Sequence, residues 1–391
     1  MTDAVTRAAA TADPLPAAAS ADDTITLNEV PCPLCGAAAS TPQLTTPDVL
    51  HGVPGVFTAA RCDGCGHVFM NPQPAAASLA ACYPDMYACH SDEVTPADAP
   101  PPEAGRAVRL MKWVPGLRPL YRWLADKRSE VIPPPGRVLE LGCGRGDFLV
   151  RLQQAGCDAV GVDLVARSVD VCRARGLDVR HGTLAAQQFE AASFDAVCGW
   201  MVLEHTPDPR ETIAEAARLL RPGGMLAFSV PDYAAWERRL FGRFWMGLEL
   251  PRHLQQFTPA TLRRLLSEEG LAVESVVHQR SAFYLVGSAG LALRSRPMTR
   301  RLGQRLIDFV DSPPMLGELA LAPLAKLLGW IGQSGRLTVI ARRDAEAAVA
   351  RRDAKEAIAR RDAEAAVARR DAEEAVARCD ETPVPDPRRA G

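Results

Sequence analysis

Three glycines spaced two residues apart mark the part of the sequence with the clearest chemistry. They occur in ELGCGRGDF (140–148), directly after the apolar run RVL, and such a turn lets a backbone approach a nucleotide closely. An ATP-binding P-loop needs Lys and then Ser or Thr after its last glycine, but Asp147 and Phe148 stand there. A dinucleotide fingerprint has one residue more before its third glycine. NAD and S-adenosylmethionine therefore remain as candidate ligands, and Asp163, about twenty residues on, suits the ribose hydroxyls of either.

Two close pairs of cysteines form a second chemical group, in CPLCG (32–36) and CDGCG (62–66). Each pair offers two thiolates from one tight turn relaxed by glycine, and four soft sulfur ligands suit tetrahedral zinc. Four cysteines already complete the shell, so we expect a structural zinc, with His67 as a competing ligand. The expected zinc ligands are Cys32, Cys35, Cys62 and Cys65.

Two polar motifs carry candidate catalytic residues. Glu204 and His205 lie in LEHTPDP, just past an apolar run, where ligands meet open α/β sheets and a histidine can take a proton near neutral pH. His253 lies in ELPRHLQQFT (249–258), directly before a capped helix. For each histidine a structural role is an equally good interpretation: His205 could only shape the pocket, and His253 could only brace the start of the helix.

Short apolar runs alternate with helical patterns around these motifs. Such alternation is typical of βαβ units with a buried parallel sheet, so we expect an α/β fold with a doubly wound sheet. Expected strands are RVLELG (137–142), AVGVDL (159–164), FDAVCGW (194–200) and MLAFSVP (225–231), with AVESVV (272–277) and GRLTVIA (335–341) as candidates for the last two; expected helices cover 148–156, 166–176, 210–224 and 258–270.

Composition sets limits on partners and location. A net charge of −2 gives no overall attraction to nucleic acid or anionic membrane. The first residues lack the pattern of a signal peptide, and no apolar run is long and uncharged enough to span a bilayer. We therefore expect a cytoplasmic protein whose eleven cysteines serve as thiols and metal ligands. An apolar helix at 316–331, preceded by several arginines, could contact a membrane surface or cover the sheet as a lid or dimer surface.

The sequence motifs resemble those of class I S-adenosylmethionine-dependent methyltransferases. VLELGCGRG, VGVDL, FDAVCGWMVLEHTPDP (194–209) and RLLRPGGMLAFSVP (218–231) occur in that family's order and spacing. The resemblance covers about residues 133–343 and implies a seven-stranded Rossmann-like sheet whose last strand is antiparallel. It also implies a set of cofactor-binding residues: Glu140, Gly142, Cys143, Gly144 and Gly146 around the methionine part, Asp163 at the ribose, Thr183 and Leu184 beside the adenine, and Trp200 near the sulfonium.

Finer resemblances bear on the acceptor. The LEHTPDP stretch looks like that of ubiquinone-pathway O-methyltransferases, some of which place a metal-binding Glu where this chain has Met201; this difference argues against a catalytic metal. The cysteine pairs followed by NPQP (71–74) resemble zinc-ribbon methyltransferases found beside bacterial glycan genes, and sugar C-methyltransferases also carry an N-terminal zinc domain. These likenesses imply a small-molecule or sugar-conjugate acceptor, with oxygen ahead of carbon and nitrogen as the accepting atom.

The expected organisation has five parts. They are a disordered start (1–28), a zinc ribbon and connector (29–94), a Pro-rich linker and helix (95–132), the methyltransferase domain (133–343) with a helical insertion (285–333), and a charged helix of nine-residue repeats (344–391). Tyr83 and Tyr87, in the connector, could reach the active site or pack under the ribbon. The sequence does not indicate an oligomeric state.

Two alternative functions remain open. Some RNA methyltransferases also carry an N-terminal zinc ribbon, but this ribbon has few of the basic residues that bind RNA, so nucleic acid is not the expected partner. A non-catalytic scaffold with a relic cofactor fold is the second alternative, and the intact glycines and Asp163 argue against it.

Overall fold

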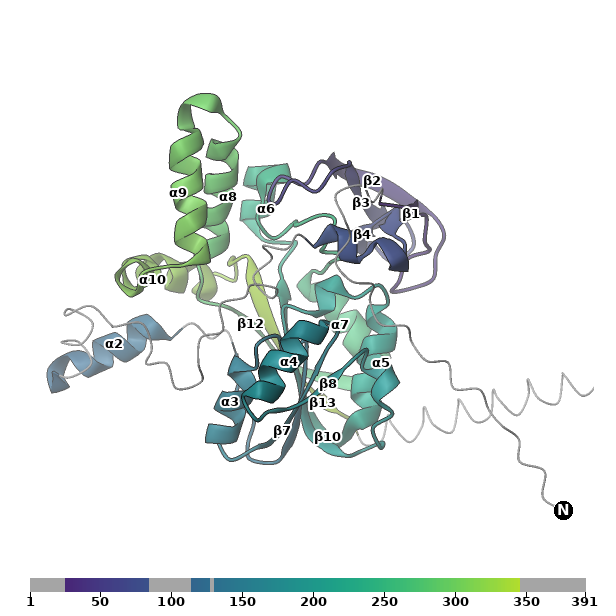
Figure 1. Ribbon diagram of the computed structural model, residues 1–391. Helices are drawn as coiled ribbons and strands as arrows, with labels where there is room; N and C mark the ends of the chain where they lie inside the picture. The colour runs from purple at the N-terminus through teal and green to yellow at the C-terminus, as the bar shows by residue number, and fades with distance from the viewer. Residues whose placement is uncertain (1–24, 84–113, 127–129, 345–391) are drawn as a thin grey trace, which may run out of the picture. The chain divides into compact units, whose positions relative to one another are not determined.

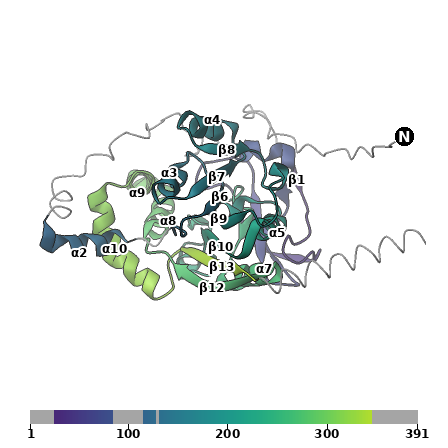
Figure 2. The same cartoon turned by 90° about the horizontal axis from the view of Figure 1, so that it is seen from below.

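A seven-stranded sheet forms the centre of the computed structural model, which describes residues 25–83, 114–126 and 130–344. Its strand order is β12-β13-β10-β9-β6-β7-β8 (Figures 1 and 2). Strand β13 runs antiparallel to both of its neighbours, and the other neighbouring pairs are parallel. The expected doubly wound α/β fold with an antiparallel last strand is confirmed. The strands are β6 (Arg137–Leu141), β7 (Asp158–Asp163), β8 (Asp178–His181), β9 (Phe194–Trp200), β10 (Leu220–Pro231), β12 (Leu271–His278) and β13 (Arg336–Arg343).

Two helices cover each face of this sheet. Helices α3 (Asp147–Gln154) and α4 (Ala166–Ala174) lie on one face, and α5 (Pro209–Leu219) and α7 (Pro259–Glu268) lie on the other (Figure 2). Local sequence defines where they begin: the Asp208 carboxylate accepts the Glu211 N–H at the start of α5, and Thr258 forms a capping box with Thr261 at the start of α7.

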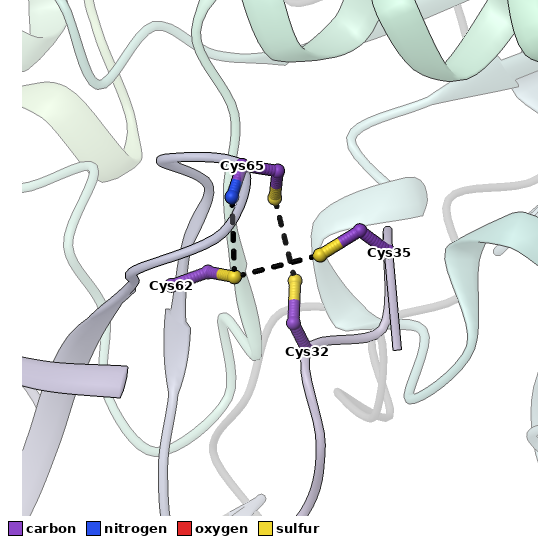
Figure 3. A group of neighbouring side chains, drawn as sticks. All are labelled: Cys32, Cys35, Cys62 and Cys65. Atoms are coloured by element: carbon purple, nitrogen blue, oxygen red, sulfur yellow. Dashed lines mark hydrogen bonds between the residues drawn. The ribbon is translucent and has the colours of Figure 1, made fainter. Parts of the chain in front are cut away.

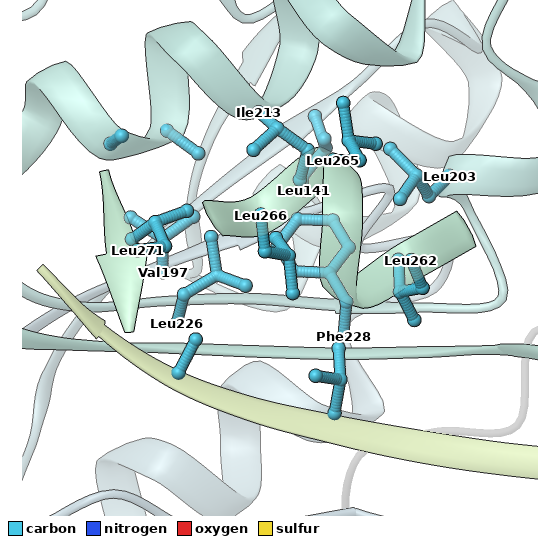
Figure 4. Packing of buried hydrophobic residues seen from close by; sticks show 14 of the residues in the cluster. Leu141, Val197, Leu203, Ile213, Leu226, Phe228, Leu262, Leu265, Leu266 and Leu271 are labelled. Atoms are coloured by element: carbon cyan, nitrogen blue, oxygen red, sulfur yellow. The ribbon is translucent and has the colours of Figure 1, made fainter. Parts of the chain in front are cut away.

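Side chains that alternate along the strands supply two hydrophobic clusters, one for each face. In β6, Val138 packs with α3 and α4, whereas Leu139 and Leu141 pack with α5 and α7. Figure 4 shows the cluster on the α5 and α7 face, in which Ile213, Leu262 and their neighbours cover the sheet. Burial on both faces explains the apolar runs in the central strands β6, β9 and β10.

The sequence prediction was wrong about the end of α5. The helix stops at Leu219, although the helical pattern was expected to continue to Gly224. Leu220 adopts an extended conformation and pairs with Phe194 of β9 before a register shift. Pro222 and the glycines after it cannot sustain a helix, so this stretch joins β10 instead.

A second sheet is built around the cysteine-rich segment. Its order is β11-β4-β3-β2, with β2 at Ser40–Thr46, β3 at Phe57–Cys62, β4 at Val68–Met70 and β11 at Gln255–Gln256. Strand β11 comes from the segment just before α7, so the larger domain donates one strand to the ribbon sheet. A short pair, β1 (Leu27–Asn28) with β5 (Gln73–Pro74), begins within the segment that was expected to be disordered.

Further helices surround the sheet. The insertion between β12 and β13 forms α8 (Phe283–Arg294), α9 (Arg300–Asp311) and α10 (Met315–Trp330), of which α8 and α9 form a hairpin (Figure 1). Helix α2 (Arg118–Ala125) contacts α10, and α6 is Trp236–Phe241. Short 3-10 turns are η1 (Ala76–Ser78), η2 (Ala80–Cys82), η4 (Pro115–Leu117), η5 (Ala185–Gln187), η6 (Leu203–His205), η7 (Gly242–Phe244) and η8 (Pro297–Thr299).

Several sequence predictions concern residues outside the described part. These are the linker around 95–105, the first part of the helix that follows it, Tyr87 and the nine-residue repeats. Among the helices that the structure describes, none combines the length and the apolar character needed to cross a membrane.

Candidate functional site

The glycine turn connects β6 to α3. Gly142, Gly144 and Gly146 have φ values of 68°, 50° and 80°, a left-handed region that favours glycine. A Cβ atom on Gly142 would lie 2.7 Å from Val202 Cγ2, and one on Gly146 would collide with Leu177. A Cβ on Gly144 would meet no atom within 4 Å. The backbone at Gly144 therefore faces open space and can accept a close ligand.

Asp163 fastens this turn to the end of β7. Its Oδ2 accepts the Gly144 N–H at 2.8 Å, and its Oδ1 accepts the Val165 N–H at 2.8 Å. The side chain was expected at the ribose of a cofactor. A carboxylate at the end of the second strand of such a sheet is a typical partner of ribose hydroxyls.

Two buried polar groups beside the turn lack partners among the described residues. Glu140 is 3% exposed and its Oε2 makes no hydrogen bond; burial, with Glu130 nearby, raises the pKa of this carboxyl well above its usual value. The Trp200 indole N–H is likewise buried and unbonded, and the ring packs edge-on against Phe148 at 5.0 Å. A bound ligand that offers both a donor and an acceptor would satisfy them.

The other expected cofactor residues lie near the same end of the sheet. Cys143 is buried, and its sulfur fills the space beside Gly161. Thr183 is exposed, and its hydroxyl accepts the Ala186 N–H at 3.3 Å. Leu184, by contrast, is 4% exposed within the hydrophobic cluster of the α5 and α7 face.

Glu204, His205 and His253 converge past the end of β9. One ligand atom of each side chain lies within 4.8 Å of the others. Turn η6 positions the first two, after Met201 has adopted a φ of 55° while its N–H bonds to Ser229 O at 3.0 Å. The segment before α7 supplies His253, 48 residues after His205 by their numbers.

Backbone carbonyls hold both imidazole rings. His205 Nδ1 lies 3.2 Å from Arg252 O and 3.1 Å from the Tyr83 hydroxyl, whereas His253 Nδ1 lies 2.9 Å from Gly247 O. The two rings pack edge-to-face with centroids 4.7 Å apart. Burial lowers the pKa of each imidazole to about 3, so both are neutral at physiological pH.

Glu204 is fully buried. Neither carboxylate oxygen has a hydrogen-bond partner among the described residues. Burial raises the pKa of this carboxyl to about 8. A buried carboxylate without hydrogen bonds is unfavourable, and Arg336 offsets only part of this cost, so the raised pKa favours the protonated form.

The ribbon sheet supports the segment that carries His253. Arg252 donates two hydrogen bonds to Asp48 at 2.8 and 3.1 Å and a third to Cys82 O. His67 Nε2 donates to the Gln255 side chain at 3.0 Å, and His67 does not belong to the group formed by the four cysteines. Sequence reasoning quoted the segment but assigned no role to Arg252 or Asp48, because nothing in the sequence pairs positions so far apart.

The four cysteines expected to bind zinc come together (Figure 3). The sulfur atoms of Cys32 and Cys65 lie 3.6 Å apart, and those of Cys35 and Cys62 lie 3.5 Å apart. A regular tetrahedron with Zn–S bonds of about 2.3 Å has S···S edges of about 3.8 Å. The four thiols therefore fit a zinc ion closely.

Comparisons with known proteins identify the family. A model described as "Methyltransferase domain" matches residues 117–276. A ubiquinone biosynthesis O-methyltransferase of Xanthomonas oryzae pv. oryzae is 32% identical over 221 residues, which span 53% of this chain and 87% of that protein. The chain belongs to the S-adenosylmethionine-dependent methyltransferases.

Two further comparisons cover other shares of the chain. A protein of the same name from Aromatoleum aromaticum is 32% identical over 34% of this chain, and the match spans 63% of that protein's length. Among solved structures, the chain is similar to an S-adenosylmethionine-dependent methyltransferase from Mesorhizobium loti, with 20% identity, a TM-score of 0.38, and coverage of 60% of this chain and 98% of that chain.

Proposed function

We propose that this methyltransferase transfers a methyl group from S-adenosylmethionine to a hydroxyl oxygen of a small molecule. The observation that carries the proposal is that the glycine turn lies against the segment that leads into the polar cluster. Gly142 packs against Val202, and Glu204 follows two residues later. A methyl donor at the turn and a proton acceptor at the cluster would thus lie side by side, which in-line transfer requires.

The chain offers groups of suitable kind for the cofactor. The open backbone at Gly144 suits the methionine part, the unbonded Oε2 of Glu140 suits its ammonium group, and the Asp163 carboxylate at the end of β7 suits the ribose hydroxyls. Thr183, exposed past the end of β8, suits contact with the adenine, whereas the buried Leu184 would shape that pocket from behind. When bound, S-adenosylmethionine supplies a methyl group already activated by its positively charged sulfur.

His205 is the best candidate for the general base. Its Nδ1 faces a carbonyl, so that atom carries the hydrogen and Nε2 has a free lone pair. The side chain is half-buried, whereas His253 is 2% exposed. We assign His253 to positioning, because its ring packs edge-on against His205. A base here would take the proton that the acceptor hydroxyl loses as the new C–O bond forms. Because burial lowers the pKa of His205 to about 3, its contribution would lie near the lower end of about 10²- to 10⁴-fold.

The acceptor class draws on the relatives. Those reported above are named as ubiquinone biosynthesis O-methyltransferases, which favours a hydroxylated small molecule over a sugar conjugate and oxygen over carbon. Structural zinc in the cysteine cluster is part of the proposal, since the sulfur spacing fits it.

Calorimetry and an acceptor screen test the proposal. S-adenosylmethionine titrated into the full-length protein should bind with micromolar affinity, and Asp163→Asn should weaken binding more than about tenfold, because an amide nitrogen cannot accept hydrogen bonds. Methyl transfer should then be sought across hydroxylated aromatic compounds and sugar conjugates, with His205→Gln as the variant that binds cofactor but transfers slowly. A folded protein that binds no S-adenosylmethionine would contradict the proposal.

A further inference from the structure

We propose that Arg336 binds a carboxylate group of the methyl acceptor, which makes the acceptor a hydroxylated aromatic acid. The inference rests on the proposed function, because it names the class of molecule that the same site would methylate. Arg336 begins β13 and pairs with Pro231 at the end of β10. Strand β10 also pairs with β9, which leads into the polar cluster. Two strand spacings of about 4.8 Å therefore separate Arg336 from β9.

The guanidinium of Arg336 has no anionic partner in the part of the chain that the structure describes. Its Nε is buried and forms no hydrogen bond with a described residue. Its Cζ lies over the ring of Tyr284, 4.4 Å from the ring centroid. An aromatic ring attracts a cation but does not replace a hydrogen-bond acceptor. A half-buried guanidinium in this state is costly, and a bound anion would offset that cost.

The nearest carboxyl groups neutralise this cation only in part. A Cβ atom on Gly335 would collide with Glu237 Oε1, so Glu237 lies against the residue that precedes Arg336, yet this oxygen is unbonded among the described residues. Burial raises the pKa of Glu237 to about 7 and the pKa of Glu204 to about 8, and the charge of Arg336 opposes both shifts. Neither carboxyl group is therefore fully ionised at neutral pH.

Arg252, the second cation that acts on the polar cluster, is already paired. It donates to both carboxylate oxygens of Asp48, at 2.8 and 3.1 Å, and its Nε lies 3.2 Å from Glu249 Oε1. The side chain of Arg252 is 0% exposed. Of these two cations, Arg336 is the one whose hydrogen-bond donors remain available to a ligand.

Arg336 lies close enough to the polar cluster to influence it. Burial, followed by the charges of Arg252 and Arg336, lowers the pKa of His253. The His253 ring packs edge-on against His205, the candidate base. An acceptor whose carboxylate is bound at Arg336 could thus extend its hydroxyl toward the base and the methyl donor.

The geometry and charge of the guanidinium favour a carboxylate. Its planar fork of N–H groups matches the two oxygens of a carboxylate, with two parallel hydrogen bonds. One positive charge also balances one carboxylate, whereas a phosphate monoester carries about −1.5 to −2 at neutral pH. Neighbouring rings favour a planar acceptor: Trp245 packs edge-on against Tyr233 and Tyr284, with centroids 6.0 Å apart in each pair.

A matched acid and amide test the assignment. Full-length protein saturated with S-adenosylhomocysteine, which has no methyl group to transfer, would be titrated by calorimetry with a dihydroxybenzoate and with the corresponding dihydroxybenzamide. We expect the acid to bind more than about tenfold more tightly, because hydrogen bonds between charged groups are the stronger ones. A hydroxyphenyl phosphate should bind no more tightly than the acid. An acid that fails to bind, binds no better than its amide, or binds less tightly than the phosphate would overturn the inference.

Variants of two arginines on β13 locate the effect. Arg336→Gln should abolish the advantage of the acid over the amide, whereas Arg336→Lys keeps the charge without the fork and should retain part of it. Arg342→Gln removes an exposed partner of Glu274 and should leave the advantage unchanged. An advantage that persists in Arg336→Gln contradicts the assignment. If that variant does not fold, an undiminished advantage in Arg336→Lys has the same meaning.

Calorimetry with S-adenosylmethionine on the same samples tests the proposed function separately. Cofactor binding together with equal affinities for the acid and the amide contradicts only the assignment of Arg336. Absence of cofactor binding by the folded protein contradicts the proposed function itself.

Discussion

Asp48 and Arg252 form a buried, two-pronged ion pair although 204 positions separate them in the chain. Their side chains are 1% and 0% exposed. Asp48 follows β2 of the ribbon sheet, whereas Arg252 precedes His253 and presents the carbonyl that accepts from His205 Nδ1. The pair therefore links the cysteine-rich part of the chain to the orientation of both histidines.

Replacing Asp48 by Asn should destabilise the protein by about 3–5 kcal/mol, because the buried guanidinium would lose its charged partner. The rate of methyl transfer should fall while the Kd for S-adenosylmethionine stays unchanged, since the glycine turn does not contact Asp48. Urea unfolding and calorimetry measure the two effects. Glu274→Gln is the matched control: it removes an exposed partner of Arg342 and should change stability by less than about 1 kcal/mol. Equal stability of the two variants would contradict this role of the pair.

The cysteine cluster should contribute to stability through its metal. Cys35→Ser should lose the bound zinc and lower the Tm by more than about 5 °C, which corresponds to roughly 4 kcal/mol for a chain of this size. The histidine segment should loosen as well, because β11 pairs with β4 of the ribbon. Zinc content and thermal unfolding measure the change, with Cys157→Ala as a control cysteine outside the cluster. An unchanged Tm after complete loss of zinc would show that the ion does not stabilise the ribbon.

The order of strands and helices was readable from the sequence because each strand is short, apolar and followed by a clear turn. Strand β8 was not among the expected strands, since its residues Asp178–His181 include three polar side chains at the edge of the sheet. The end of α5 was misjudged because Leu220 keeps the helical spacing of apolar residues although its backbone is extended. The spacing of apolar residues could not distinguish a continuing helix from an extended strand at this point.

The candidate site was only partly predictable. Sequence motifs named Glu204, His205 and His253 separately, but their convergence depends on how the segment before α7 folds back. Nothing in the sequence indicated that Asp48 and Glu249 are buried near the site, because a lone acidic residue in a loop is usually solvated. The strand that the larger domain donates to the ribbon was equally hidden, since Gln255 and Gln256 have no strand pattern.

Gly144 offers a clean test of the cofactor turn. Gly144→Ala should weaken S-adenosylmethionine binding more than about tenfold, because a methyl group would occupy the open space beside the backbone. The left-handed φ of 50° should cost about 1–2 kcal/mol of stability. Gly176→Ala carries the same backbone strain at the end of α4, also without a close neighbour, and should leave binding intact. Calorimetry that shows equal affinities for the two variants would exclude a cofactor at this turn.

Helix α10 is the part of the fold where contact with a membrane surface is expected. Leu327 and Trp330 are 51% and 84% exposed, whereas the arginine-rich turn between α8 and α9 lies at the other end of the hairpin (Figure 1). If α10 binds bilayers, the protein should float with anionic vesicles, and Trp330→Glu should abolish flotation without changing the Tm. Glu318→Gln serves as a control on the same helix. Wild-type protein that stays unbound would leave α10 as a cover of the fold only.

Glu237 should make stability depend on pH between about pH 4.5 and neutrality. It is 1% exposed, its Oε1 has no partner among the described residues, and burial together with Asp232 raises the pKa of its carboxyl to about 7. The unfolded chain releases this proton near pH 4.5, so the folded state binds more protons between about pH 4.5 and 7. The free energy of unfolding should therefore fall as pH rises through this range and stay reduced above it.

Glu237→Gln keeps the shape of the side chain and removes its charge. The variant should match the wild type near pH 5 and exceed its free energy of unfolding by roughly 1–3 kcal/mol at pH 8.5. Urea unfolding across this pH range measures the difference, and Glu274→Gln, at an exposed site, should show no such trend. A difference that is constant with pH would mean that Glu237 ionises in the folded protein at its usual pKa, with Arg336 or another cation compensating its charge.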